Sequence, residues 1–229
     1  MNDTVHRPRG DGSPKILILM LKERLFLMKL NLPNKLTLAR MFMVPFLMIF
    51  ITFDFGLGIW SRLIAAGFFA LASATDFLDG YLARRDNLVT NFGKFMDPLA
   101  DKLMVFVALI SLCYVTGRDG LWIESERIYG VCLLAATVIV IFRELAVTSM
   151  RMVVTNTDGV VIAANWLGKV KTCVQILCIL TAIIEPMFSY KFLGGHAVSY
   201  VTMTAMSVLT IWSGVVYFKG YWKYINPSV

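Results

Sequence analysis

Two apolar segments meet in a polar turn within residues 75–102, whose sequence is TDFLDGYLARRDNLVTNFGKFMDPLADK. Asp76 and Asp79 lie three residues apart before the turn, and Asp97 and Asp101 lie four residues apart after it. Residues at these spacings share one face of a helix. We therefore expect a helical hairpin whose turn brings the four carboxylates to one level and into one cleft.

The sequence around this hairpin is too apolar for an ordinary soluble domain. Hydrophobic residues make up 58% of the 229 residues and charged residues 16%, whereas soluble domains contain about 25% charged residues. A membrane-spanning helix needs about 20 apolar residues. Six segments meet this need: Leu36–Phe55, Ile59–Ala83, Phe95–Thr116, Ile128–Val154, Trp166–Phe188 and Val198–Phe218. The sequence predicts an all-α, polytopic membrane protein with six transmembrane helices.

Three regions follow from this pattern. Residues 1–14 contain almost no apolar side chains and are expected to be a disordered extension. Residues 15–30 are apolar but interrupted by Lys22, Glu23 and Arg24, which predicts a short interfacial amphipathic helix rather than a span. Residues 31–229 form the predicted six-helix domain.

The basic residues explain the topology better than they explain nucleic-acid binding. The net charge is +7, but the Lys and Arg residues cluster beside apolar segments on one predicted side of the membrane. The positive-inside rule makes this side cytoplasmic, and we expect a multi-pass protein of the cell membrane with its acids facing the cytoplasm. Four cysteines lie in apolar stretches without a C-x-x-C pair, which argues against a disulfide framework or a thiolate metal site.

Four clustered carboxylates require cationic partners, since each intramembrane acid costs about 2.5 to 3.5 kcal/mol. Hard oxygen ligands without nearby His or Cys favour Mg²⁺ or Mn²⁺. Two such ions would neutralise the four acids and stabilise a phosphoryl displacement. The small residues Gly80, Ala83 and Gly93 would let a ligand or a neighbouring helix approach the backbone closely. The alternative is that the acids only cap helices or pair with nearby Arg and Lys.

The motif D-x2-D-G-x2-A-R-x8-G-x3-D-x3-D is present at every fixed position, and on it the chain resembles the CDP-alcohol phosphotransferase family. The matching residues are Asp76, Asp79, Gly80, Ala83, Arg84, Gly93, Asp97 and Asp101. The resemblance implies that the first three aspartates bind metal with the CDP-linked diphosphate. It implies that Asp101 is a metal ligand and also the base that activates the acceptor hydroxyl. It further implies a homodimer.

A second set of residues concerns the donor. By the same resemblance, Asn34 and Thr37 help to hold the cytidine or diphosphate, together with Gly80, Ala83, Arg84 and Gly93. The alternative for Asn34, Thr37 and Arg40 is a helix cap followed by an interfacial arginine.

Basic residues outside the motif bear on the acceptor. Arg143 and Arg151 lie near the end of the fourth predicted span, and Lys169 and Lys171 lie at the start of the fifth. Together they could bind one phosphate; the alternative is that they only snorkel to the headgroups. The segments NLPNKLTLAR, RELAVTSMR and GKVKT resemble those of family members that transfer phosphatidyl from CDP-diacylglycerol to glycerol 3-phosphate. Inositol phosphate, serine or phosphatidylglycerol remain alternative acceptors.

A function of another class is also compatible with intramembrane acids, namely a divalent-cation transporter. Such a path should carry polar residues across the bilayer. The predicted spans are nearly all apolar beyond the level of the aspartates, which favours the enzyme.

Overall fold

The computed structural model describes residues 32–53, 55–85, 91–119, 124–158, 166–188 and 196–225. In these ranges the chain forms six long helices and one short 3-10 helix: α2 (Leu32–Thr52), α3 (Ile59–Arg85), α4 (Asn91–Asp119), α5 (Glu124–Asp158), α6 (Trp166–Ile184), η2 (Glu185–Met187) and α7 (Ala197–Ile225). The predicted all-α class is confirmed, and each predicted span overlaps one long helix, although the spans predicted to end at Phe55 and Phe188 run past the ends of α2 and α6. The extension 1–14 and the interfacial helix 15–30 lie outside the described residues.

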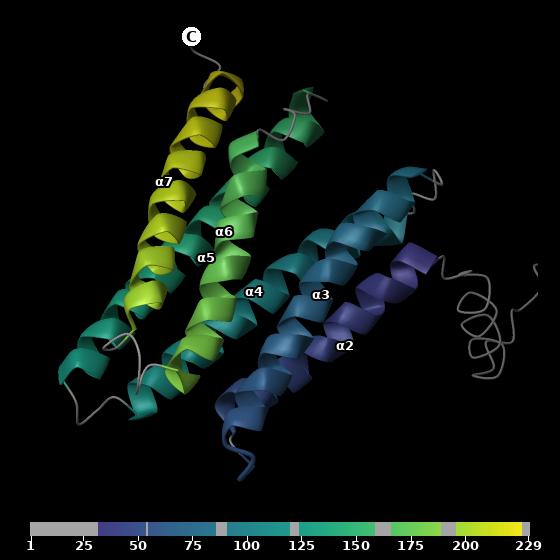
Figure 1. Cartoon of the computed structure of the whole chain (residues 1–229). Helices are drawn as coiled ribbons and strands as arrows, with labels where there is room; N and C mark the ends of the chain where they lie inside the picture. The colour runs from purple at the N-terminus through teal and green to yellow at the C-terminus, as the bar shows by residue number, and fades with distance from the viewer. Residues whose placement is uncertain are drawn as a thin grey trace, which may run out of the picture.

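Consecutive helices run in opposite directions, as Figure 1 shows. Helices α2, α4 and α6 begin at the end of the bundle where α3, α5 and α7 finish. We call this the motif end, because the aspartate motif occupies the last turns of α3 and the first turns of α4. The other end of the bundle is called the opposite end.

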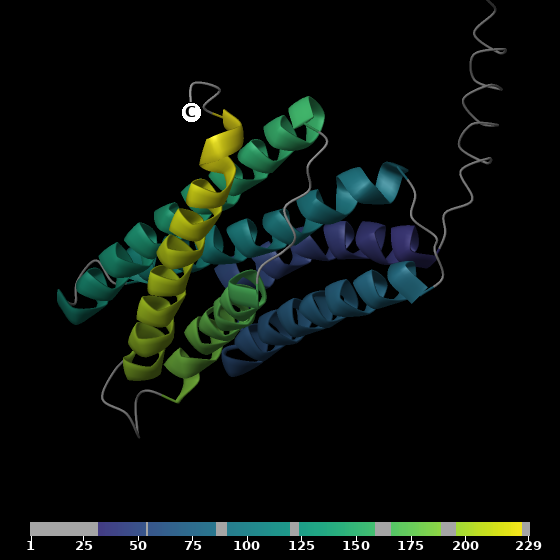
Figure 2. The same cartoon turned by 90° about the horizontal axis from the view of Figure 1, so that it is seen from above.

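Two groups of three helices make up the bundle. Helix α2 packs against α3 and α4, and α7 packs against α5 and α6. Contacts of α4 with α5, and of α3 with α6, join the two groups. Seen from above in Figure 2, α2, α3 and α4 lie side by side. The ends of α3 and α4 that carry the aspartate motif lie at the same end of the bundle as the end of α5 and the start of α6.

The main core is an apolar cluster to which all six long helices of the described ranges contribute. Ala65 of α3 and Ala108 of α4 have no exposed surface, and such small side chains let helices approach closely. A smaller cluster of Val147, Val154, Tyr217 and Tyr221 packs α5 against α7 near the motif end. These two clusters consist of hydrophobic residues and hold the helices in place around the site.

Five helices in the described ranges are long and apolar enough to cross a membrane: Lys35–Thr52, Pro98–Gly117, Arg127–Val154, Trp166–Met187 and Ala197–Trp222. Helix α3 is not among them, since Arg62 near its start and Asp76 near its end shorten its uncharged run. The prediction of six helices thus agrees with the structure, while the count of six spans is not confirmed.

Large apolar side chains cover the outside of the bundle. Phe77 is 78% exposed and Phe142 is 74% exposed. Soluble monomers rarely expose extended apolar surfaces of this kind, whereas lipid-facing helices do. The chain is a multi-pass membrane protein.

Candidate active site

A fully buried arginine holds the first aspartate of the motif. Arg40 of α2 has no exposed surface, and its Nη1 donates a hydrogen bond to Oδ1 of Asp76 across 2.5 Å. The Asp76 side chain, on α3, is 39% exposed. A carboxylate has about four lone-pair sites, so this bond orients Asp76 and leaves it acceptor capacity toward the open side. Arg40 is therefore not the interfacial arginine that the capping alternative supposed.

The fourth aspartate lies where the acids meet the basic residues. Asp101 of α4 is half-buried, and the charges of Asp76, Lys102, Arg40 and Glu144 all act on its carboxylate. It lines a small cavity of about 40 Å³ together with residues of α4, α5 and α6, namely Lys102, Val105, Phe106, Glu144, Lys171, Thr172 and Gln175. Asp101 thus lies near both the acidic residue Asp76 and the basic residue Lys171.

Glu144 joins two of the four predicted phosphate-binding cations. Its Oε1 accepts hydrogen bonds from Nη1 of Arg143, at 2.9 Å, and from Nζ of Lys171. Lys171 lies on α6 and is only 4% exposed, whereas Glu144 lies on α5. Since two cations share one carboxylate, the group retains a net positive charge beside Asp101.

Helix α7 fixes the position of Arg143. Nη2 of Arg143 donates to Oγ of Ser213 across 2.5 Å, and its guanidinium carbon lies 5.4 Å from the centre of the Tyr217 ring. A Cβ atom built on Gly214 would lie 3.2 Å from Cγ of Arg143. Gly214 therefore leaves room for the side chain of Arg143 to pack against α7.

The other two predicted cations are placed differently. Arg151 and Lys169 are both exposed. Lys169 precedes Lys171 by two residues, which corresponds to roughly 200° around a helix. The structure therefore brings Arg143 and Lys171 together beneath the surface, and leaves Arg151 and Lys169 on the exterior of the motif end.

The remaining donor-side residues are located by their helices. Thr37 is buried on α2, one turn before Arg40. Asn34 lies on α2, Asp79, Gly80, Ala83 and Arg84 lie on α3, and Gly93 and Asp97 lie on α4. Their side chains are outside the described part of the structure. Among the described side chains no group of three His, Cys, Asp or Glu gathers, and the four-carboxylate cluster stays a prediction.

Two residues of the site were not assigned from the sequence: Arg40, which is the partner of Asp76, and Gln175, which lines the Asp101 cavity. Glu144, which the sequence offered either as the partner of Arg143 or as a substrate contact, binds both Arg143 and Lys171. A charged residue inside a spanning helix is by itself a reason to expect a functional partner, and this signal could have identified Arg40. No spacing rule connects α2 to α3 or α5 to α6.

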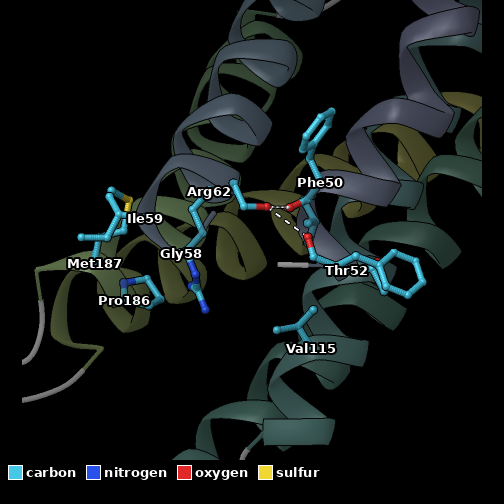
Figure 3. Close-up of a pocket in the computed structure, with 11 residues that line it drawn as sticks. Phe50, Thr52, Gly58, Ile59, Arg62, Val115, Pro186 and Met187 are labelled. Atoms are coloured by element: carbon cyan, nitrogen blue, oxygen red, sulfur yellow. Dashed lines mark hydrogen bonds between the residues drawn. The ribbon is translucent and has the colours of Figure 1, made fainter. Parts of the chain in front are cut away.

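A larger cavity at the opposite end is separate from this site. It has a volume of about 330 Å³ and is shown in Figure 3 with Arg62, Val115 and Pro186 along its wall. Oγ of Ser61 donates to the carbonyls of Phe50 and Phe53 at 3.0 and 3.1 Å. Between the two ends, the buried residues of α4 include Val105, Ala108, Leu109 and Leu112. These apolar side chains do not favour an ion path.

Comparison with known proteins agrees with this geometry. The family model of CDP-alcohol phosphatidyltransferase matches residues 30–213. An enzyme of Bacillus subtilis (strain 168), named CDP-diacylglycerol--glycerol-3-phosphate 3-phosphatidyltransferase, is 39% identical over 214 residues, which cover 86% of this chain and 98% of the relative. An enzyme of the same name from Yersinia enterocolitica is 34% identical over 197 residues, or 86% of this chain and 97% of the relative.

A third relative of that name, from Salmonella choleraesuis, is 34% identical over 191 residues, which cover 83% of this chain and 94% of the relative. The matched region contains the whole aspartate motif, Arg40, Glu144 and Lys171. Enzymes of this family generally use divalent metal ions. The chain belongs to the CDP-alcohol phosphatidyltransferase family and is a phosphatidyl-transferring membrane enzyme.

Proposed function

We propose that this enzyme transfers the phosphatidyl group from CDP-diacylglycerol to glycerol 3-phosphate, giving phosphatidylglycerophosphate and CMP. The acceptor assignment rests on two cations, Arg143 and Lys171, which share the carboxylate of Glu144. Lys171 and Glu144 line the cavity of Asp101. An acceptor that bears a phosphate dianion suits this net positive charge, whereas a neutral alcohol does not require it. The relatives named above for this reaction support the same acceptor.

The metal site of the proposal consists of Asp76, Asp79, Asp97 and Asp101. Their donors are hard carboxylate oxygens, which suit Mg²⁺ or Mn²⁺. The fit is supported by Arg40, whose bond to one oxygen of Asp76 fixes the direction of that carboxylate, as partners of metal ligands commonly do. When bound, two ions would neutralise the diphosphate and stabilise the charge that develops on the leaving CMP.

The protein's own residues account for the remaining steps. Arg143 and Lys171 bind the phosphate of the acceptor and direct its hydroxyl toward Asp101. Asp101 accepts the hydroxyl proton as the oxygen attacks the β-phosphorus of CDP-diacylglycerol. A new oxygen–phosphorus bond forms, the bond from the β-phosphorus to the bridging oxygen breaks, and CMP leaves with that oxygen. No covalent intermediate with the enzyme is needed.

The other motif residues complete the donor site. Gly80, Ala83 and Gly93 leave room for the diphosphate near the helix backbones, while Arg84, Asn34 and Thr37 bind the cytidine or the phosphates. Arg151 and Lys169 are exposed near the motif end, where their charge attracts anionic substrates. We propose that this end faces the cytoplasm of a cell-membrane protein, since most cations gather there. We also propose that the enzyme is a homodimer.

The test is release of CMP by purified enzyme given Mg²⁺ and CDP-diacylglycerol, with one acceptor at a time. We expect release with glycerol 3-phosphate and only background release with serine, inositol phosphate, phosphatidylglycerol or no acceptor. Removal of Mg²⁺ with a chelator should stop the reaction. Faster release with any other acceptor would overturn the assignment of glycerol 3-phosphate.

A further inference from the structure

A buried amide lies in the Asp101 cavity without a hydrogen-bond partner for its nitrogen. Gln175 of α6 is 3% exposed, and its Nε2 is buried and has no partner within the described part of the structure. Gln175 and Asp101 line the same cavity of about 40 Å³. Buried polar groups are nearly always hydrogen-bonded, so this donor points to a ligand that enters the cavity.

The position of Gln175 relative to Lys171 indicates which part of a ligand it meets. Gln175 follows Lys171 by four residues on α6, which places the two on one helix face about 6 Å apart along the axis. Helix α6 runs from the motif end into the bundle. A ligand whose phosphate binds Lys171 and whose carbon chain enters the cavity therefore meets both Asp101 and Gln175, which line it.

We propose that Gln175 determines acceptor specificity. Its Nε2 donates a hydrogen bond to the second hydroxyl of the acceptor, the one that does not attack the phosphorus. This inference rests on the proposed function, in which the acceptor is glycerol 3-phosphate. Its terminal hydroxyl, the less hindered of the two, attacks the phosphorus under Asp101. The middle hydroxyl is then the group that Gln175 binds. A cavity of about 40 Å³ admits one such small polar group.

The experiment compares glycerol 3-phosphate with 3-hydroxypropyl phosphate, which keeps the phosphate and the terminal hydroxyl but lacks the middle hydroxyl. For the wild-type enzyme we expect kcat/KM to be about tenfold higher with glycerol 3-phosphate, the effect of one buried hydrogen bond. Gln175→Leu should lower kcat/KM for glycerol 3-phosphate to about the value of the analogue and leave the analogue nearly unaffected. KM for CDP-diacylglycerol should not change.

Two further variants separate the hydrogen bond from the shape of the side chain. Gln175→Met keeps a similar length and shape but has no N–H donor and only a weakly accepting sulfur, so it should abolish the preference as well. Thr181→Val is the matched control, because Thr181 lies farther along α6 and bonds to Thr202 across 2.9 Å, away from the cavity. This variant should keep the wild-type preference.

Several results would overturn the inference. A wild-type enzyme that used both acceptors equally well would refute it without any variant, even if Gln175→Leu failed to fold. Equal losses for both acceptors in Gln175→Leu would mean that Gln175 only orients Asp101. An enzyme that used serine and neither phosphorylated acceptor would instead refute the proposed function, and this assignment with it.

Discussion

Arg40 on α2 donates from Nη1 to Oδ1 of Asp76 on α3 across 2.5 Å, although the two residues lie 36 positions apart in the chain. The arginine side chain has no exposed surface, whereas that of Asp76 is 39% exposed. Arg40 does not touch bulk solvent; its guanidinium orients Asp76, and its charge also acts on the carboxylate of Asp101. The bond makes α2 part of the site as well as part of the scaffold.

Replacing Arg40 with Lys should impair the metal site. A lysine retains the charge but not the planar geometry of the guanidinium, so Asp76 loses its fixed direction. Changes to the partners of metal ligands commonly cost about 10- to 100-fold in activity or metal affinity. We expect a loss of that order in kcat and a higher Mg²⁺ concentration for half-maximal rate, measured by CMP release. Arg62→Lys, at the opposite end, is the control and should change neither quantity. If Arg40→Lys also changed neither quantity, Arg40 would not be needed to orient Asp76.

Replacing Asp101 with Asn should remove the base and one proposed metal ligand while preserving side-chain size. Loss of a general base costs about 10²- to 10⁴-fold, so CMP release should fall to background. The variant should elute from size-exclusion chromatography as the wild type does. Activity retained within a few-fold of wild type would mean that another group takes the proton.

Replacing Gly214 with Ala should impair acceptor binding. The added Cβ would lie 3.2 Å from Cγ of Arg143, so the arginine side chain must move by a few tenths of an ångström. This movement should weaken its bonds to Ser213 and Glu144. We expect KM for glycerol 3-phosphate to rise about tenfold, the cost of one weakened charge-assisted hydrogen bond, with KM for CDP-diacylglycerol unchanged. Gly67→Ala is the matched control, because a Cβ on Gly67 meets nothing within 4 Å. Equal behaviour of the two variants would refute the role of Gly214.

Replacing Glu185 with Ala should destabilise the fold without changing the chemistry. Glu185 of η2 accepts hydrogen bonds from the backbone nitrogens of Val198 and Ser199, at 2.8 and 2.6 Å, and so caps α7. Loss of hydrogen bonds to a charged group costs about 2 kcal/mol. We expect a lower thermal midpoint in detergent, with a smaller drop for Glu185→Gln. Kinetic constants below the transition should match the wild type, and a kinetic defect at full stability would contradict the assignment.

The helices can be predicted from the sequence because apolar runs of this length and the charges between them are sufficient evidence. The bounds are less accurate. Helix α5 ends at Asp158 rather than at Val154, and α4 begins at Asn91 rather than at Phe95, since a helix continues beyond the apolar segment that reveals it. Arg62 and Asp76 explain why α3 differs in apolarity from the other five helices.

The site was predictable only where its residues are close in sequence. The aspartate motif follows from spacing on two adjacent helices. The contact of Lys171 with Glu144 spans 27 positions, and that of Arg143 with Ser213 spans 70. Such contacts depend on how α5 packs against α6 and α7, which no periodicity encodes. The grouping of Lys169 with Lys171 has another cause, since the helical period alone turns two residues at this spacing apart.

A competition between acceptors, with identification of the lipid product, tests whether a phosphorylated acceptor displaces CMP directly. Purified enzyme, Mg²⁺ and CDP-diacylglycerol would be incubated with equal concentrations of glycerol 3-phosphate, inositol phosphate and serine, and the lipids analysed by mass spectrometry. We predict phosphatidylglycerophosphate as the main product, formed in equal amount to CMP. A main product containing inositol phosphate or serine would contradict glycerol 3-phosphate as the acceptor. CMP release without a new lipid would contradict direct displacement.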